Sequence, residues 1–159
     1  MKTLMAIAIL AWTLPAGTKA HPLFDQLKKL EGTWTSDSKD HPADVTYKLS
    51  AGGSVLVETM AMGNHAEMIT MYHADGDALA LTHYCVIGNQ PRMKASKDQK
   101  PGSIKFEGDG GSNMKPEDKH MHAMTLTFVD ADHIRQDWAM YEGGKEQAVH
   151  TINLTRNKK

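Results

Sequence analysis

The chain has 159 residues, of which 40% are hydrophobic and 23% are charged, a composition typical of one soluble globular domain. Its 18 Lys and Arg residues nearly balance its 19 Asp and Glu residues, so the formal net charge is −1. Because nucleic acids and anionic lipids attract strongly basic surfaces, this charge balance excludes both as expected partners.

The first twenty residues have the features of a secretory signal peptide. Lys2 provides a positive charge, and the uncharged apolar run that follows, from Leu4 to Leu14, is too short to span a bilayer. Thr18-Lys19-Ala20 then places small residues at a cleavage site. We therefore expect residues 1–20 to be removed and the secreted chain to reach the periplasm or the extracellular space.

Residues 21–159 are expected to form a single domain. They contain no second long apolar stretch, so the sequence predicts no membrane insertion. Cys85 is the only cysteine, and an intramolecular disulfide is therefore impossible. The hydrophobic core alone must stabilise the fold, which a chain of roughly 140 residues can achieve. The sequence leaves the oligomeric state open.

A short helix is predicted first, from the helical spacing of Leu23, Phe24, Leu27 and Leu30. Alternating apolar and polar residues then predict strands over residues 32–38, 43–50, 54–62, 66–73, 78–87, 90–96, 103–108, 119–129, 133–142 and 146–156. Asp75-Gly76, Gly110-Gly111 and Gly143-Gly144 suit tight turns, and residues 109–118 are the longest connection. Short turns make consecutive strands pair, which favours an all-β, antiparallel up-and-down β-barrel of about ten strands over a sandwich.

The alternation also predicts which side chains point into the barrel. In the strand over residues 78–87, the more apolar face carries Leu79, Leu81, His83 and Cys85. In the strand over residues 119–129, one face carries His120, His122, Met124, Leu126 and Phe128.

The strand over residues 66–73 is ambiguous, because both of its faces are partly apolar. Ile69 and Met71 form one apolar set. A tight hairpin at Asp75-Gly76 would instead turn the opposite set, which includes Thr70 and Tyr72, toward the barrel interior.

The first and last strands of the predicted barrel carry a recognisable pair of residues. Gly32-Thr33-Trp34 follows the helix and opens the first strand, and Arg156 lies near the end of the last strand. This pair resembles the signature of the calycins, the superfamily of lipocalins and fatty-acid-binding proteins. The resemblance implies that Arg156 covers Trp34 and that both are structural. Ten strands bring the chain closer to the fatty-acid-binding proteins and the haem-binding nitrobindins, but no nitrobindin haem ligand matches residue by residue.

A more local resemblance covers Glu67 to Asp77, Leu81 to Cys85 and Gly88 to Met93. These segments are similar to a family of exported bacterial lipocalin-like proteins of unknown function. The resemblance implies a fold and an exported location, and it implies no reaction.

His120-x-His122-x-Met124 is the sharpest candidate metal site. At a period of two residues, all three side chains would leave one face of one strand. Two imidazoles and a thioether suit copper, and two imidazoles can begin a zinc site. Haem is a further candidate. The alternative is that these histidines are hydrogen-bonded residues near the barrel mouth or are solvated.

Arg92 lies in an unusual segment, Gly88 to Met93. Pro91 cannot donate a hydrogen bond to a neighbouring strand, so the segment is predicted to be an edge, a bulge or a loop. The Arg92 guanidinium could close a cavity mouth and bind a carboxylate through two parallel hydrogen bonds. The alternative is a turn with a solvated arginine.

The leading functional prediction is non-catalytic binding of a small, largely apolar ligand inside the barrel. The polar residues expected in the cavity are His83, Cys85, Arg92 and His122. Binding of copper, zinc or haem through His120, His122 and Met124 is the second hypothesis. The third is an enzyme that acts on a small hydrophobic substrate with His83 or Tyr84 as acid or base, although the sequence lacks Gly-x-Ser-x-Gly and His-Glu-x-x-His motifs. A filled barrel with only a structural role is the fourth.

Overall fold

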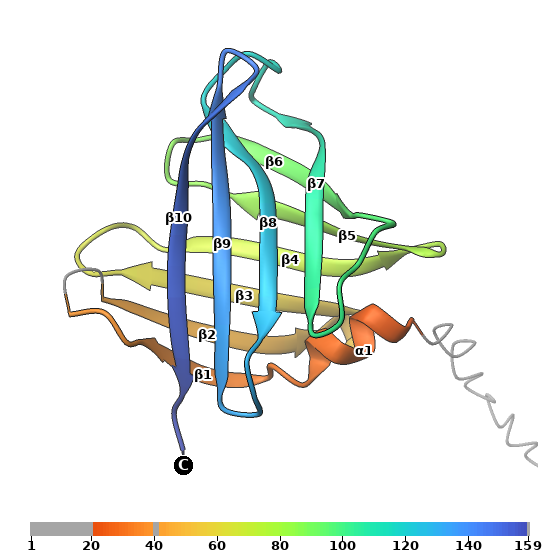
Figure 1. The fold of residues 1–159 in the computed structure, drawn as a ribbon, viewed down its shortest axis with the longest axis vertical. Coiled ribbons are helices and arrows are strands. Elements are labelled where there is room, and N and C mark those ends of the chain that lie inside the picture. The colour runs from red at the N-terminus through yellow and green to blue at the C-terminus, as the bar shows by residue number, and fades with distance from the viewer. Residues whose placement is uncertain (1–20, 40–41, 159) are drawn as a thin grey trace, which may run out of the picture.

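The computed structural model describes residues 21–39 and 42–158, so the expected signal peptide lies outside the described residues (Figure 1). The helices are α1 (Pro22–Lys28) and a short 3-10 turn, η1 (Ala51–Gly53). The strands are β1 (Gly32–Ser36), β2 (Ala43–Ser50), β3 (Val55–Met62), β4 (Met68–Asp75), β5 (Ala78–Tyr84), β6 (Gln90–Ala95), β7 (Ser103–Ser112), β8 (His120–Phe128), β9 (His133–Glu142) and β10 (Lys145–Arg156).

The strands form one closed barrel. Each strand pairs antiparallel with the strands before and after it in sequence, and β1 pairs with β10 to complete the ring. The predicted all-β, up-and-down barrel with a short N-terminal helix is therefore confirmed. Among the described residues, no helix is long and apolar enough to cross a membrane.

The end of β7 departs from the sequence prediction. The sequence predicts a turn at Gly110 and Gly111, but both lie inside β7, where Gly111 pairs with Pro91 of β6. Gly110 has a φ of 78° at an irregularity in this pairing, so its conformational freedom serves a β-bulge rather than a hairpin. The connection to β8 is therefore limited to residues 113–119.

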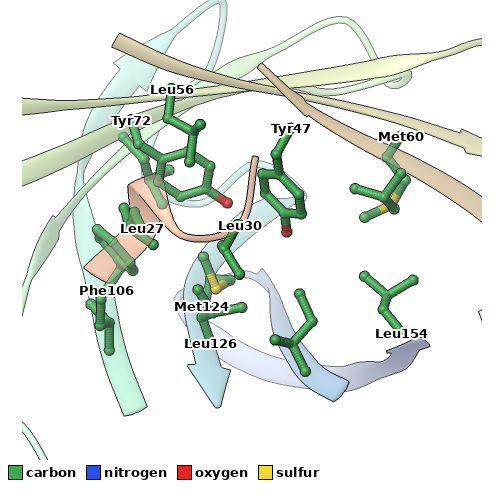
Figure 2. Packing of buried hydrophobic residues seen from close by; sticks show 14 of the residues in the cluster. Leu27, Leu30, Tyr47, Leu56, Met60, Tyr72, Phe106, Met124, Leu126 and Leu154 are labelled. Carbon is green, nitrogen blue, oxygen red and sulfur yellow. The ribbon is translucent and has the colours of Figure 1, made fainter. Parts of the chain in front are cut away.

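Helix α1 packs across one end of the barrel (Figure 1). The His21 side chain accepts a hydrogen bond from the Phe24 N–H, and Pro22 occupies the first turn, where its missing N–H is not needed. Leu27 and the following Leu30 are almost fully buried. Figure 2 shows these two leucines among core side chains from the strands, namely Tyr47, Leu56, Tyr72, Phe106, Met124 and Leu126.

The turn at Asp75-Gly76 decides which face of β4 is buried. In the resulting hairpin Tyr72 pairs with Leu81 and Thr70 pairs with His83. Thr70 and Tyr72 are accordingly buried, and Ile69 and Met71 are only partly covered. The ambiguity in the sequence is therefore resolved by turn geometry rather than by hydrophobicity.

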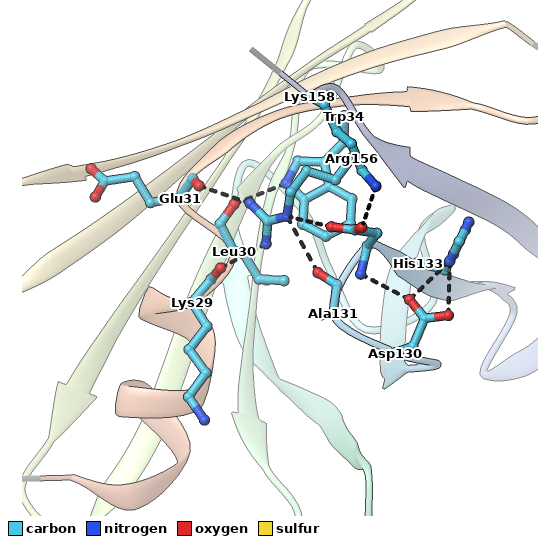
Figure 3. Close-up of polar contacts among 10 residues, drawn as sticks. Lys29, Leu30, Glu31, Trp34, Asp130, Ala131, His133, Arg156 and Lys158 are labelled. Carbon is cyan, nitrogen blue, oxygen red and sulfur yellow. Dashed lines mark hydrogen bonds and ion pairs between the residues drawn. The ribbon is translucent and has the colours of Figure 1, made fainter.

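Arg156 ties three separate segments together beside Trp34 (Figure 3). Its guanidinium carbon lies 4.1 Å from the centre of the Trp34 ring. The same group donates hydrogen bonds to the carbonyl oxygens of Lys29 at 2.8 Å, Glu31 at 3.0 Å and Ala131 at 3.3 Å. The Trp34 Nε1–H donates to the Leu30 carbonyl at 2.8 Å. The end of the α1 segment, β1 and the β8–β9 turn are therefore all anchored to β10.

Replacing Arg156 tests this anchor. We expect Arg156→Ala to lower the free energy of unfolding by about 2–4 kcal/mol, because it removes three charge-assisted hydrogen bonds and a cation–π contact. Arg156→Lys should recover only part of this loss, since an ammonium group lacks the planar fork. Urea denaturation measures both. Lys158→Ala is the control, because the Lys158 side chain is 79% exposed. If Arg156→Ala were as stable as Lys158→Ala, the expectation would be contradicted.

Candidate functional site

The barrel contains a cavity of about 350 Å³ at the end opposite α1, which we call the inner cavity. Its volume lies in the range of pockets for small organic ligands. The apolar wall consists of Met60, Met62, Met68, Met121, Trp138, Met140 and Ile152. Val86 and Ile87 also line it and are 53% and 51% exposed, so the mouth carries apolar side chains in contact with solvent.

Five methionines give this wall an adaptable surface. Methionine is unbranched and has a polarisable thioether, so its side chain can repack around ligands of different shape. Met121 and Met140 pair across β8 and β9, and Met60 and Met68 pair across β3 and β4. Methionines thus line opposite sides of the same cavity, an arrangement suited to an apolar ligand.

His83 provides a polar group in this wall. Its Nδ1 lies 3.0 Å from the Thr70 hydroxyl, and its ring centre lies 4.7 Å from that of Trp138. The Nε2 atom is buried and has no hydrogen-bond partner. Burial lowers the pKa of His83 to about 4, so the imidazole is neutral near pH 7. The cavity lining therefore includes one unsatisfied nitrogen next to the apolar wall, and its other polar residues are His65, Cys85, Lys119, His120 and His150.

A buried polar network lies deeper in the barrel and ends at the same wall. Glu58 accepts hydrogen bonds from the Tyr72 hydroxyl at 2.6 Å and the Gln136 amide at 3.1 Å. Gln136 also donates to Tyr47, and it accepts from the Trp138 indole at 2.8 Å. Burial raises the pKa of Glu58, which favours its protonated form. Trp138 thus links the network to His83.

The sequence reasoning missed this network, although a signal for it was present. Glu58 lies between Leu56 and Met60 on the inward face of β3, and all three are buried. A charged residue at the centre of an apolar, period-two set indicates a buried polar group that needs partners. The partners come from β2, β4 and β9, and only the closed barrel brings them to Glu58.

The structure divides the four predicted cavity residues between two places. His83 and Cys85 line the inner cavity, and so does His150. Arg92 and His122 instead line a pocket of about 340 Å³ on the outer wall, formed by β6, β7, β8 and the loop of residues 113–119. We call this the outer pocket. The expectation of one shared set of polar residues is therefore wrong.

The prediction that His120, His122 and Met124 share one face is also wrong. Met121 pairs with Met140 and Ala123 pairs with Ala139, so His122 is an extra residue in a β-bulge that interrupts the alternation. Met124 is fully buried in the core, whereas the His122 ring stacks on Tyr141 with centres 4.2 Å apart. Among the described residues, no group of three or more His, Cys, Asp or Glu side chains is arranged to hold a metal ion. Copper, zinc or haem binding stays a prediction that this geometry does not favour.

Comparisons with known proteins support the fold and assign no activity. No protein-family model and no curated protein matches the chain. A solved structure from Nostoc punctiforme, a protein of unknown function from the DUF3598 family, is similar with a TM-score of 0.55 at 11% sequence identity. The match covers 83% of this chain and 49% of that one, so the chain spans about half the length of its structural neighbour. At this identity the likeness concerns the fold alone.

The buried His83 predicts a specific dependence of stability on pH. Burial lowers its pKa from 6.5 to about 4, so between these values the unfolded chain binds more protons than the folded chain. The contribution of His83 to the free energy of unfolding should therefore fall by about 3 kcal/mol as the pH drops through this window, and then level off.

Urea denaturation of the wild type and of His83→Phe at about pH 7 and about pH 4.5 measures this contribution. The difference in stability between the two proteins should shift in favour of the variant at the lower pH. His65→Asn is the control, because His65 is exposed. A pH-independent difference for His83→Phe would show that His83 does not titrate as expected.

Proposed function

We propose that the chain is an exported carrier of calycin type that binds a small, largely apolar ligand in the inner cavity without catalysis. The observation that supports this most directly is the buried, unpartnered Nε2 of His83 in a methionine-rich wall. An unsatisfied buried polar group costs about 1–3 kcal/mol. A ligand that supplies the missing hydrogen bond would offset that cost when it binds.

The environment of His83 defines the class of ligand. The Thr70 hydroxyl can donate to Nδ1 or accept from it, so Nε2 is either a donor or an acceptor, depending on the tautomer. A hydroxyl group can match either state. We therefore propose a ligand with an apolar body and one hydroxyl, with the body against the methionines and the hydroxyl at His83. Export rests on the signal-peptide features of residues 1–20.

The enzyme hypothesis has less support from the same residues. With a pKa of about 4, neutral His83 is a weak base near pH 7. Tyr84, the other candidate acid or base, is 43% exposed and does not line the inner cavity. A binding role uses the observed groups without requiring a second catalytic residue.

A matched pair of fluorescent probes tests the proposal. We expect the wild type to bind 2-naphthol about fivefold more tightly than naphthalene, because one net hydrogen bond contributes about 1 kcal/mol. His83→Phe should keep the affinity for naphthalene and lose the preference for 2-naphthol. Met140→Trp should weaken both by filling the cavity. Fluorescence titration measures each affinity.

Arg92→Gln is the matched control, since Arg92 lines the outer pocket and not the inner cavity. Its affinities for both probes should equal those of the wild type. Absence of binding by the wild type, or an unchanged preference in His83→Phe, would contradict the proposed function.

A further inference from the structure

The outer pocket has a different chemistry from the inner cavity. Its charged and titratable lining residues are Arg92, Lys115, His120 and His122, and no Asp or Glu is among the described residues that line it. Met114, Pro116 and Met121 add apolar surface. A pocket that combines basic groups with apolar surface suits a small organic anion.

Two β-bulges in neighbouring strand pairs shape this pocket. Between the pairs Pro91–Gly111 and Met93–Gly108, Arg92 of β6 lies opposite two residues of β7. In β8, His122 is the extra residue of the second bulge. Bulges redirect side chains and occur often beside functional sites. Here they bring an arginine and a histidine to the same pocket from opposite sides of β7.

Glycines of β7 between these side chains keep the pocket open. A Cβ at Gly108 would lie 2.6 Å from the His122 ring, and a Cβ at Gly111 would lie 2.5 Å from the Met114 sulfur. Neither position can therefore carry a side chain without displacing its neighbours. Gly110 would place a Cβ 3.6 Å from the Arg92 guanidinium. Bare backbone thus forms the part of the pocket next to Arg92.

The guanidinium of Arg92 has no hydrogen-bond or ion-pair partner among the described residues, whereas Lys94, two positions along the chain, forms two ion pairs. Lys94, also on the outer face of β6, forms ion pairs with Asp75 at 3.4 Å and Asp109 at 3.3 Å. Acidic side chains are thus available nearby, yet they pair with Lys94. Arg92 is left with all five of its donors available to a ligand.

The two histidines form a hydrogen-bonded pair that can take up a proton at the pocket. The His120 Nδ1–H donates to the Asp118 carbonyl at 2.6 Å, so in neutral His120 the Nε2 atom is an acceptor. His122 Nδ1 lies 3.0 Å from that atom and therefore donates to it. The remaining nitrogen of neutral His122, Nε2, is unprotonated. A proton added there converts His122 into a cation and a further donor for an anion.

We propose that the outer pocket binds the carboxylate or phosphate group of a small organic anion, with Arg92 as the principal ligand-binding residue and protonated His122 as a second donor. The apolar side chains of Met114 and Pro116 would contact the organic body. The proposal does not depend on ligand binding in the inner cavity, because Arg92 and His83 line different pockets.

Calorimetric titration with benzoate and with phenyl phosphate at low salt tests this site. Arg92→Gln should weaken the binding of either anion at least about tenfold, because charge-assisted hydrogen bonds to a guanidinium are strong. Lys48→Gln is the matched control, since it makes the same change of charge at an exposed position on β2. Its affinity should stay within about twofold of the wild type. Tighter binding of benzoate would identify a carboxylate as the headgroup, and tighter binding of phenyl phosphate a phosphate.

The pH dependence of benzoate binding tests the role of His122. Burial and the neighbouring His120 lower the pKa of His122, and Glu107 partly opposes this. The other titratable or charged groups that line a pocket together with this ring are Arg92, Lys105, Lys115, His120, Asp137, Tyr141 and Glu146. Benzoate stays ionised between about pH 5.5 and 8, so the affinity of the wild type should rise as the pH falls and His122 gains its proton.

His122→Phe keeps the aromatic stack on Tyr141 and should abolish most of this rise. Any one of three results would overturn the proposal. The first is that the wild type binds neither anion at millimolar concentration. The second is that Arg92→Gln binds both anions as tightly as the wild type, and the third is that Lys48→Gln loses as much affinity as Arg92→Gln. Retained naphthalene binding in Arg92→Gln would show that such a loss is local to the outer pocket.

Discussion

The closure of the barrel depends on the short seam between β1 and β10. This seam comprises only three paired positions, from Trp34–Arg156 to Ser36–Leu154, because β1 has just five residues. Arg156 reinforces it by covering Trp34 and by binding carbonyl oxygens on both sides. Without a disulfide, these contacts and the core hold the ring closed. The inner cavity requires that ring, since its lining strands β3 to β5 and β8 to β10 face each other only when the barrel is closed.

The barrel interior is not uniformly apolar, because it consists of a filled core, a polar network and a cavity. Near α1 it is filled by large side chains, whereas a polar network centred on Glu58 crosses its middle and ends at Trp138. Above this network the wall is rich in methionine and contains the unsatisfied nitrogen of His83. The filled part stabilises the fold, and the network separates it from the cavity at the other end.

The bulges determine which side chains face the inside of the barrel and which face its outer wall. At the irregularity in β8 the alternation of side chains changes sides, so Met121 and Met124 both face the interior. In a regular strand, two residues three positions apart would point to opposite faces. His122 is displaced toward Arg92 on the outer wall. Two pockets with different linings therefore lie on either side of the same strand, and His120 and Met121 line both.

Local pattern was sufficient for the helix, the ten strands and their order, because period-two alternation and short turns leave few other pairings. It also placed His83 and Leu81 on the inner face, whereas the contact between Arg156 and Trp34 was implied by the resemblance to the calycins. Local pattern could not locate the bulges, since Gly110 suits a bulge and a turn equally well and His122 has no feature that marks it as an extra residue. It could not find the partners of Glu58 either, because they lie on distant strands. The sequence by itself determined the barrel and the inward faces of its regular strands, such as β5. The tertiary structure alone decided where the bulges lie and which polar side chains share a pocket, because both depend on the register between paired strands.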